Sequence, residues 1–131
     1  MIHSVENLHR FGIKVFLSAS PDPDLHAFVP MFHRWIQTHA VDGLLIDVAD
    51  YTHLKDGPQV LLAGHEGNYA IDCSEGRTGL YYYRKTPTGG SLLDRLVTSC
   101  QTVLRASVLL EADDSLGTRY CFRGDEIQFI S

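Results

Sequence analysis

The chain has 131 residues, with 11 Lys and Arg against 16 Asp and Glu, which gives a net charge of −5 when the seven histidines are neutral. Hydrophobic residues make up 44% and charged residues 21%, ordinary globular fractions that exclude disordered, collagen-like and coiled-coil classes. The length predicts a single domain over residues 1–131. Both signs of charge are spread along the chain and no apolar run approaches ~20 residues, so we expect neither a nucleic-acid partner nor a membrane span.

Cysteine usage indicates the compartment. Cys73, Cys100 and Cys121 are odd in number and none belongs to a Cys-x-x-Cys motif. The first residues lack the basic-then-apolar plan of a signal peptide. We therefore expect free thiols in a reducing, cytoplasmic setting.

The first third of the chain predicts a strand, a helix and a second strand. Residues 13–18 are mostly apolar and predict a strand, and turn-forming residues follow them. Asp22 can cap a helix whose apolar stripe runs from Leu25 to His39, and Pro30 predicts a kink near residues 26–30 or a helix that begins there. The short apolar run 44–49 predicts a central strand.

The middle of the chain predicts a long hairpin. Alternation over residues 61–73 is typical of one long strand, bent near Gly64 and Gly67. A two-residue turn at 75–76 then leads into a strand over 78–84. This register places Tyr69 opposite Tyr82 and Ile71 opposite Leu80.

The last third predicts a second helix and a terminal hairpin. Ser91 and Asp94 form a capping box at the start of this helix. Residues 118–122 and 126–130 flank the turn signal at Gly124, which predicts a hairpin. The apolar stripe expected to face the core from this helix comprises Leu93, Leu96, Val97, Cys100, Val103, Leu104 and Val108.

The order of elements, β-α-β-β-β-α-β-β, predicts an α+β two-layer sandwich with two helices on one face of a mainly antiparallel sheet. A ferredoxin-like split unit is a close relative of this arrangement. The first β-α-β unit allows a right-handed crossover that makes the first two strands parallel. The pattern stops at Ser131 without a polar tail, so either the last strand ends the domain or the natural chain continues.

Asp47 is the first candidate for catalysis, because it is a lone carboxylate in an apolar strand and His65-Glu66 follow on the next strand. If the two strands are neighbours, Asp47 could orient the His65 imidazole as a general base. The alternative is that Asp47 points to solvent or caps a backbone group, since fully buried carboxylates are rare. No nucleophile motif accompanies the pair.

The residue spacing also bears on two further kinds of site, for metals and for anions. The histidines lack zinc-ligand spacing, so we expect no metal, and no motif predicts a cofactor. Arg84, Lys85 and Ser91 surround a Gly-containing loop before a helix N-terminus, where free N–H groups favour an anion. The alternative is a plain strand-to-helix connection, because no Gly-Lys-Ser/Thr is present and Asp94 already lies in the first turn.

The run Tyr81-Tyr82-Tyr83 places tyrosines on both faces of its strand, although one helix layer can cover only one face. Exposed tyrosines beside Arg84 are typical of interfaces, so Tyr81 and Tyr83 predict a homodimer contact or partner surface on the outer sheet face. Cross-strand tyrosine pairs are also ordinary stabilisers of sheets.

Segments 32–37, 44–51 and 57–66 together resemble a family of uncharacterised bacterial proteins with no assigned activity. The similarity covers most of the chain from Ile13 onward. It implies a bacterial cytoplasmic protein whose natural chain continues past Ser131, and it implies no reaction, cofactor or catalytic residue. We therefore expect a non-catalytic interaction or homodimerising domain. The alternative is an enzyme or small-molecule site at Asp47, His65 and Glu66.

Overall fold

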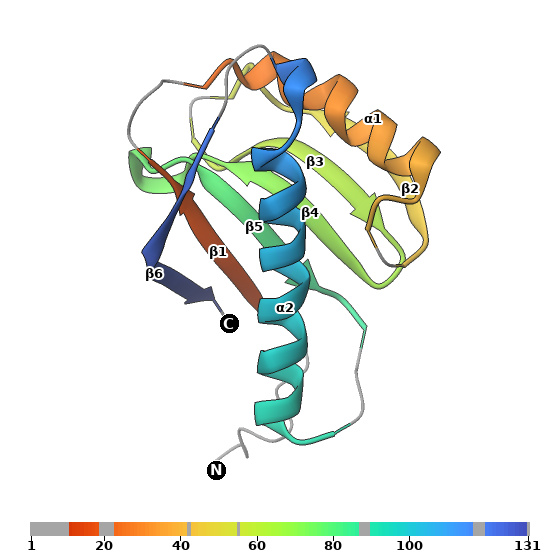
Figure 1. Cartoon of the computed structure of the whole chain (residues 1–131), viewed down its shortest axis with the longest axis vertical. Coiled ribbons are helices and arrows are strands. Elements are labelled where there is room, and N and C mark those ends of the chain that lie inside the picture. Colours follow the sequence, from red (N-terminus) through yellow and green to blue (C-terminus); the bar gives the residue numbers. More distant parts are fainter. Residues whose placement is uncertain are drawn as a thin grey trace.

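The computed structural model describes residues 11–18, 23–41, 43–54, 56–86, 90–116 and 120–130. Within these ranges, a six-stranded sheet carries two α-helices on one face, which is the predicted α+β sandwich (Figure 1). The strand order is β2-β3-β4-β5-β1-β6, and every neighbouring pair is antiparallel. The elements are β1 (Gly12–Leu17), η2 (Leu25–Ala27), α1 (Phe28–Thr38), β2 (Leu45–Asp50), β3 (Pro58–Gly64), β4 (Gly67–Asp72), η3 (Ser74–Gly76), β5 (Gly79–Arg84), α2 (Leu92–Glu111), η4 (Asp114–Leu116) and β6 (Phe122–Ile130).

The core lies between the sheet and the helices. α1 packs on β2 and β3, whereas α2 packs on β1 and β5. Trp35 of α1 makes an edge contact with the ring of Tyr69, which in turn packs on Tyr82 with ring centroids 4.8 Å apart. Tyr82 therefore points to the helix side, and Tyr81 and Tyr83 point to the outer face.

The β4–β5 pairing confirms the predicted register. Tyr69 lies opposite Tyr82 and Ile71 lies opposite Leu80. The turn at residues 75–76 forms within η3, where Glu75 and Gly76 both adopt positive φ. The short connection between β4 and β5 limits how the two strands can pair. A slip of one residue would move every side chain of a strand to the other face of the sheet, so the apolar alternation determines the register.

The start of α1 also follows the sequence signals. The helix begins at Phe28, so Pro30 lies in its first turn, where its missing N–H costs nothing. Asp24 caps the preceding η2 by accepting a hydrogen bond from the His26 N–H, while Asp22 lies outside the described residues. His39 is an exposed C-cap residue in the left-handed conformation, so the last position of the predicted stripe lies outside the core.

The expected single strand over residues 61–73 is wrong. The chain reverses at His65-Glu66 and forms the β3–β4 hairpin. Gly64 and Gly67 flank the reversal and approach each other so closely that a Cβ at Gly64 would overlap the carbonyl oxygen of Gly67. Glycines that suggested a bend thus allow a complete turn.

The expected terminal hairpin is also wrong, because residues 122–130 form one continuous strand, β6, beside β1. Val15 lies opposite Ile127 and Leu17 lies opposite Phe122, so a single β1 residue faces four residues of β6. The residues around Gly124, which predicted a turn, instead form this bulge, seen as the bend in β6 in Figure 1.

The first two strands are not neighbours. The pairings make β1 and β2 run in the same direction, as predicted, but β5, β4 and β3 lie between them. The two edges of the sheet are therefore β2 and β6.

The apolar stripe of α2 is only partly in the core. The helix begins with the predicted capping box, in which Ser91 and Asp94 each bond the other's backbone N–H. Only Val103 of the predicted stripe is fully buried; Leu96 and Cys100 are half-buried, and Leu93, Val97, Leu104 and Val108 are exposed. The residues that α2 buries are Arg95, Ser99, Val103, Ala106, Ser107 and Leu110.

Candidate functional site

The structure gives Asp47 and His65 separate hydrogen-bond partners. Asp47 lies on the edge strand β2 with an exposed side chain, and its Oδ1 accepts a hydrogen bond from the backbone N–H of Val48 at 2.8 Å. His65 lies in the β3–β4 turn, where its backbone N–H donates to the carbonyl of Leu44 at 2.8 Å. In the described part of the chain no hydrogen bond joins the Asp47 carboxylate to the His65 ring. The side chain of Asp47 thus caps a backbone group, which was the alternative interpretation.

Glu66 lies in the same turn and is exposed, with its Oε2 3.7 Å from Nη1 of Arg84. A hollow of about 10 Å³ lies beside it, lined in part by Glu66, Tyr69 and Tyr82. That volume is at the limit for one water molecule, whereas ligand pockets usually enclose about 300–1,000 Å³. The three residues of the predicted catalytic group therefore do not surround a cavity of substrate size in the described structure.

Several donors of the predicted anion site are already engaged. Ser91 and Asp94 satisfy each other in the capping box, with N–O distances of 3.1 and 3.2 Å. Arg84 donates from Nε to the carbonyl of Thr86 at 3.1 Å, and the Lys85 backbone N–H donates to the carbonyl of Glu66. Residues 87–89, which complete the loop, lie outside the described residues.

The tyrosines of the outer face pack on each other and on the sheet. The rings of Tyr81 and Tyr83 meet edge to face with centroids 6.3 Å apart, and both side chains are half-buried. The Tyr81 ring lies over Gly12, where any Cβ would overlap it. Burial, with smaller contributions from Tyr83 and Asp72, raises the pKa of the Tyr81 hydroxyl above its ordinary value. This face is therefore less open than the sequence suggested.

A buried ion pair on the same face was missed by the sequence analysis. Lys14 is only 1% exposed and Asp72 5% exposed. The ammonium of Lys14 donates to Asp72 Oδ2 at 2.8 Å and to the carbonyl of Arg77 at 2.6 Å. Asp72 also accepts hydrogen bonds from the backbone N–H and hydroxyl of Ser74. A lysine inside a strand carries no signal of such burial, because its partner is 58 residues away.

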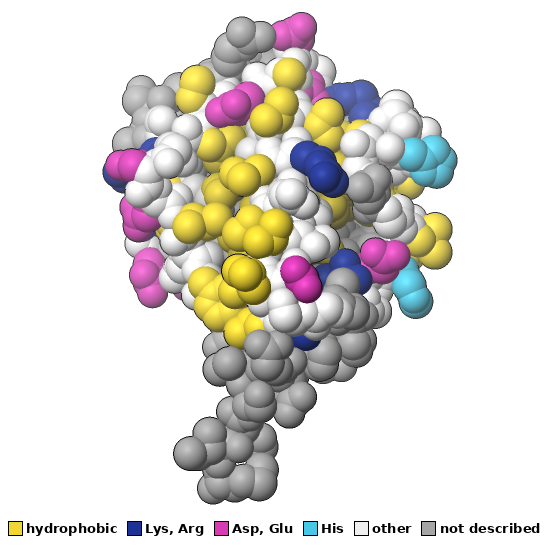
Figure 2. All heavy atoms as spheres, turned by 60° about the horizontal axis from the view of Figure 1, so that its bottom comes forward, with side chains coloured by type: hydrophobic (Ala, Val, Ile, Leu, Met, Phe, Trp, Pro, Cys, Tyr) yellow, Lys and Arg dark blue, Asp and Glu magenta, His cyan; other side chains and the backbone are white. Residues whose placement is uncertain are grey.

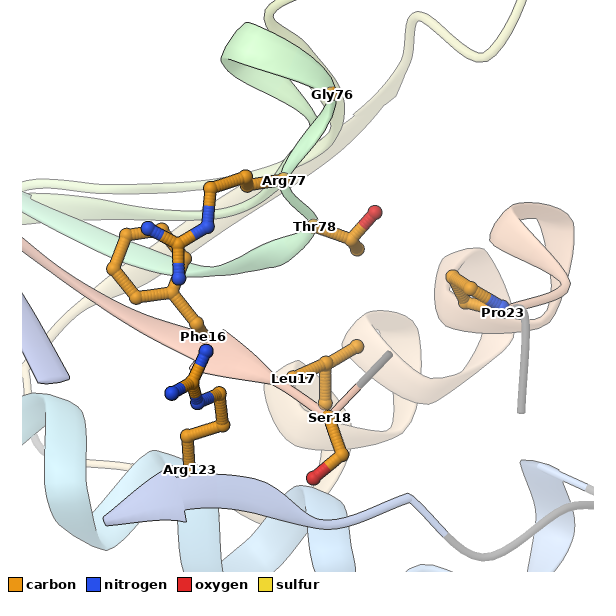
Figure 3. A pocket seen from close by; sticks show the side chains of 8 residues that line it. All are labelled: Phe16, Leu17, Ser18, Pro23, Gly76, Arg77, Thr78 and Arg123. Carbon is orange, nitrogen blue, oxygen red and sulfur yellow. The ribbon is translucent and has the colours of Figure 1, made fainter. Parts of the chain in front are cut away.

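Two arginines line a hollow of about 240 Å³ between β1, η3 and β6 (Figure 3). The guanidinium of Arg77 lies over the ring of Phe16 at 3.8 Å and forms two 2.7 Å hydrogen bonds with Glu126. Arg123 bonds both carboxylate oxygens of Asp125. Because each guanidinium already holds a carboxylate, the hollow offers little net positive charge to an anionic ligand.

The largest unexpected feature is an exposed apolar surface that spans α2 and β6. Leu93 is 69% and Val108 63% exposed, and the side chains between them are about half exposed. Figure 2 shows hydrophobic side chains gathered into a band on the side of the molecule that carries α2. We call this the α2–β6 surface; its members are Leu93, Val97, Leu104, Val108, Ile127 and Phe129.

Neither the described residues nor comparison with known proteins assigns a function to the chain. Within the described ranges, no group of three or more His, Cys, Asp and Glu could hold a metal ion. None of the helices seen there is long and apolar enough to cross a membrane. Comparison of the chain with protein-family models, with curated proteins and with solved structures found no match.

Proposed function

We propose that the protein is a non-catalytic interaction domain that works as a homodimer in a bacterial cytoplasm. One observation carries this proposal: six large apolar side chains are exposed together on the α2–β6 surface. Scattered exposed apolar residues are normal, but a contiguous patch above a few hundred Å² is typical of an interaction site. The resemblance to bacterial proteins and the three free cysteines support the proposed setting.

The surroundings of the residues predicted to be catalytic support the non-catalytic part of the proposal. Asp47 bonds its neighbouring backbone, and Glu66 faces a hollow too small for a substrate. Nothing in the described contacts favours the enzyme alternative over the interaction domain.

Size-exclusion chromatography with light scattering tests the proposal. The wild-type chain is expected to run as a dimer at about 50 µM and to dissociate on dilution, because an interface of this size supports micromolar affinity more readily than nanomolar. A monomer at every concentration up to about 500 µM would overturn the proposal.

Two variants locate the contact. Leu104→Glu places a carboxylate in the α2–β6 surface, whereas Tyr83→Glu places one on the outer sheet face where the sequence predicted the interface. Thr98→Glu makes a similar charge change at an exposed position of α2 outside the apolar stripe and serves as the control. We expect Leu104→Glu to yield monomer while Thr98→Glu and Tyr83→Glu remain dimeric. Loss of the dimer in Tyr83→Glu alone would assign it to the tyrosine face.

A further inference from the structure

The helix layer of this fold stops short of one edge of the sheet. Packed helices lie about 8–10 Å apart and strands about 4.8 Å apart, so one helix covers roughly two strands. α1 covers β2 and β3, and α2 covers β5 and β1. Only the end of α2 is seen to reach β6, where Glu111 accepts a hydrogen bond from the backbone N–H of Phe122 at 2.7 Å, and neither α1 nor α2 packs extensively on this strand. Ile127 and Phe129 of β6 lie opposite Val15 and Ile13, so their side chains point to the helix side of the sheet. The place beside α2 and above β6 is thus about one strand wide and opens at the edge of the sheet, where a further helix can enter from outside the chain.

The flank of α2 that borders this place is apolar. Leu93, Val97, Cys100 and Leu104 follow one another at spacings of four, three and four residues, the repeat of a coiled-coil seam. Val108 continues the stripe one turn later.

The opposite flank of α2 faces α1. Thr102 and Arg105 line a small cavity there with Ala40 and Val41, which follow α1 in the chain. The apolar stripe therefore lies on the side of α2 away from α1, next to β6, and the two apolar strips form the walls of one slot.

We propose that α2 of a second copy fills this slot, antiparallel to the first α2, about a twofold axis near Cys100. The inference rests on the proposed homodimer and specifies its contact. An antiparallel pairing centred there sets Leu93 of one copy against Val108 of the other, and Val97 against Leu104. The same stripe is then complementary to itself, as a twofold interface requires.

The helix dipoles favour this antiparallel direction. Antiparallel helices align their macrodipoles favourably, whereas a parallel pair would place like ends together.

The area is sufficient for a modest dimer. At roughly 100 Å² of exposed area each, the six side chains of the α2–β6 surface offer about 600 Å² per copy, against about 800 Å² per partner in a standard interface. Polar atoms at the rim can supply the remainder.

Disulfide trapping tests both the surface and the direction. Cys100→Ser and Cys121→Ser first remove the nearby and the exposed native thiols. Val97→Cys and Leu104→Cys are then made singly in this background. Facing residues of paired helices can reach the ~5.5 Å Cα separation that a disulfide needs. Positions 97 and 104 of one helix are about 10 Å apart, so any disulfide between these two positions joins two chains.

We expect mild oxidation of an equal mixture of the two single variants to give a covalent heterodimer at least tenfold faster than either variant alone gives a homodimer. Rapid cross-linking of Val97→Cys with itself would show parallel helices and overturn the antiparallel pairing. A dimer in light scattering without any of these cross-links would refute the α2 contact while the proposed function stands. A monomer in light scattering would refute the proposed function itself.

Discussion

The buried ion pair between Lys14 and Asp72 yields the sharpest prediction on stability. Asp72→Asn removes the negative charge and leaves the Lys14 ammonium, 1% exposed, with no anionic partner among the described contacts, which are the carbonyl of Arg77 and the ring of Phe16 at 5.2 Å. Breaking a buried pair from one side usually costs about 3–5 kcal/mol, because an uncompensated charge stays buried. In a chain of this length that loss corresponds to a fall in Tm of about 11–18 °C.

The same geometry predicts an asymmetry between the two partners. Lys14→Met keeps the volume of the side chain, and Asp72 retains its two hydrogen bonds from Ser74 at 3.0 and 3.1 Å. We therefore expect Lys14→Met to cost less, about 1–3 kcal/mol. The double variant should be more stable than Asp72→Asn alone, since it removes the orphaned charge.

Urea unfolding measures the free energy of unfolding of all three variants. The protein concentration is kept the same throughout, because dimerisation would otherwise change the apparent stability. The expected order of stability is wild type, Lys14→Met, the double variant, and Asp72→Asn last. A cost below about 1 kcal/mol for Asp72→Asn, or a double variant no more stable than it, would refute the reasoning.

Three smaller predictions follow from local geometry. Gly79→Ala should lower the free energy of unfolding by about 1–3 kcal/mol or more, because a Cβ there would overlap the carbonyl oxygen of Val15. Gly124 has open space around it, so Gly124→Ala should change that free energy by no more than about 0.5 kcal/mol in the same unfolding assay. Ser91→Ala should cost about 1 kcal/mol by removing the cap of α2, and circular dichroism during unfolding would report no loss if the cap were unimportant. Burial opposes ionisation of Asp113, but hydrogen bonds from Ser115 and Arg34 hold its pKa below the ordinary value. The ionised Asp113 therefore stabilises the folded state above the unfolded pKa near 4, and this stabilisation is lost as the pH falls through the lower folded pKa. In Asp113→Asn the free energy of unfolding should depend less on pH in that acidic range. An unchanged pH dependence would contradict this role of Asp113.

Local signals in the sequence predicted the fold well where the interaction itself is local. The capping box at Ser91 and the register of Tyr69 with Tyr82 depend on residues close in the chain, and both are confirmed. The failures occurred at glycines. Gly64 and Gly124 both relax the backbone, but whether the chain then turns or bulges depends on a distant strand.

The candidate sites were less predictable, because they depend on contacts far apart in sequence. Asp47 and His65 belong to different elements of the fold, and the β2 edge leaves Asp47 exposed and bonded to its own neighbour. The pairing of Lys14 with Asp72 joins two strands on either side of β5, and neither residue has an unusual sequence context.

The second helix shows most clearly what periodicity can and cannot establish. The spacing correctly grouped Leu93, Val97, Leu104 and Val108 on one face, but hydrophobicity alone placed that face in the core. In the structure, α2 instead buries a different face, which carries Arg95, Ser99, Val103, Ala106, Ser107 and Leu110. The helix therefore has two faces to cover, and the sheet of one chain covers only the first. The second surface is the physical reason to expect a second copy.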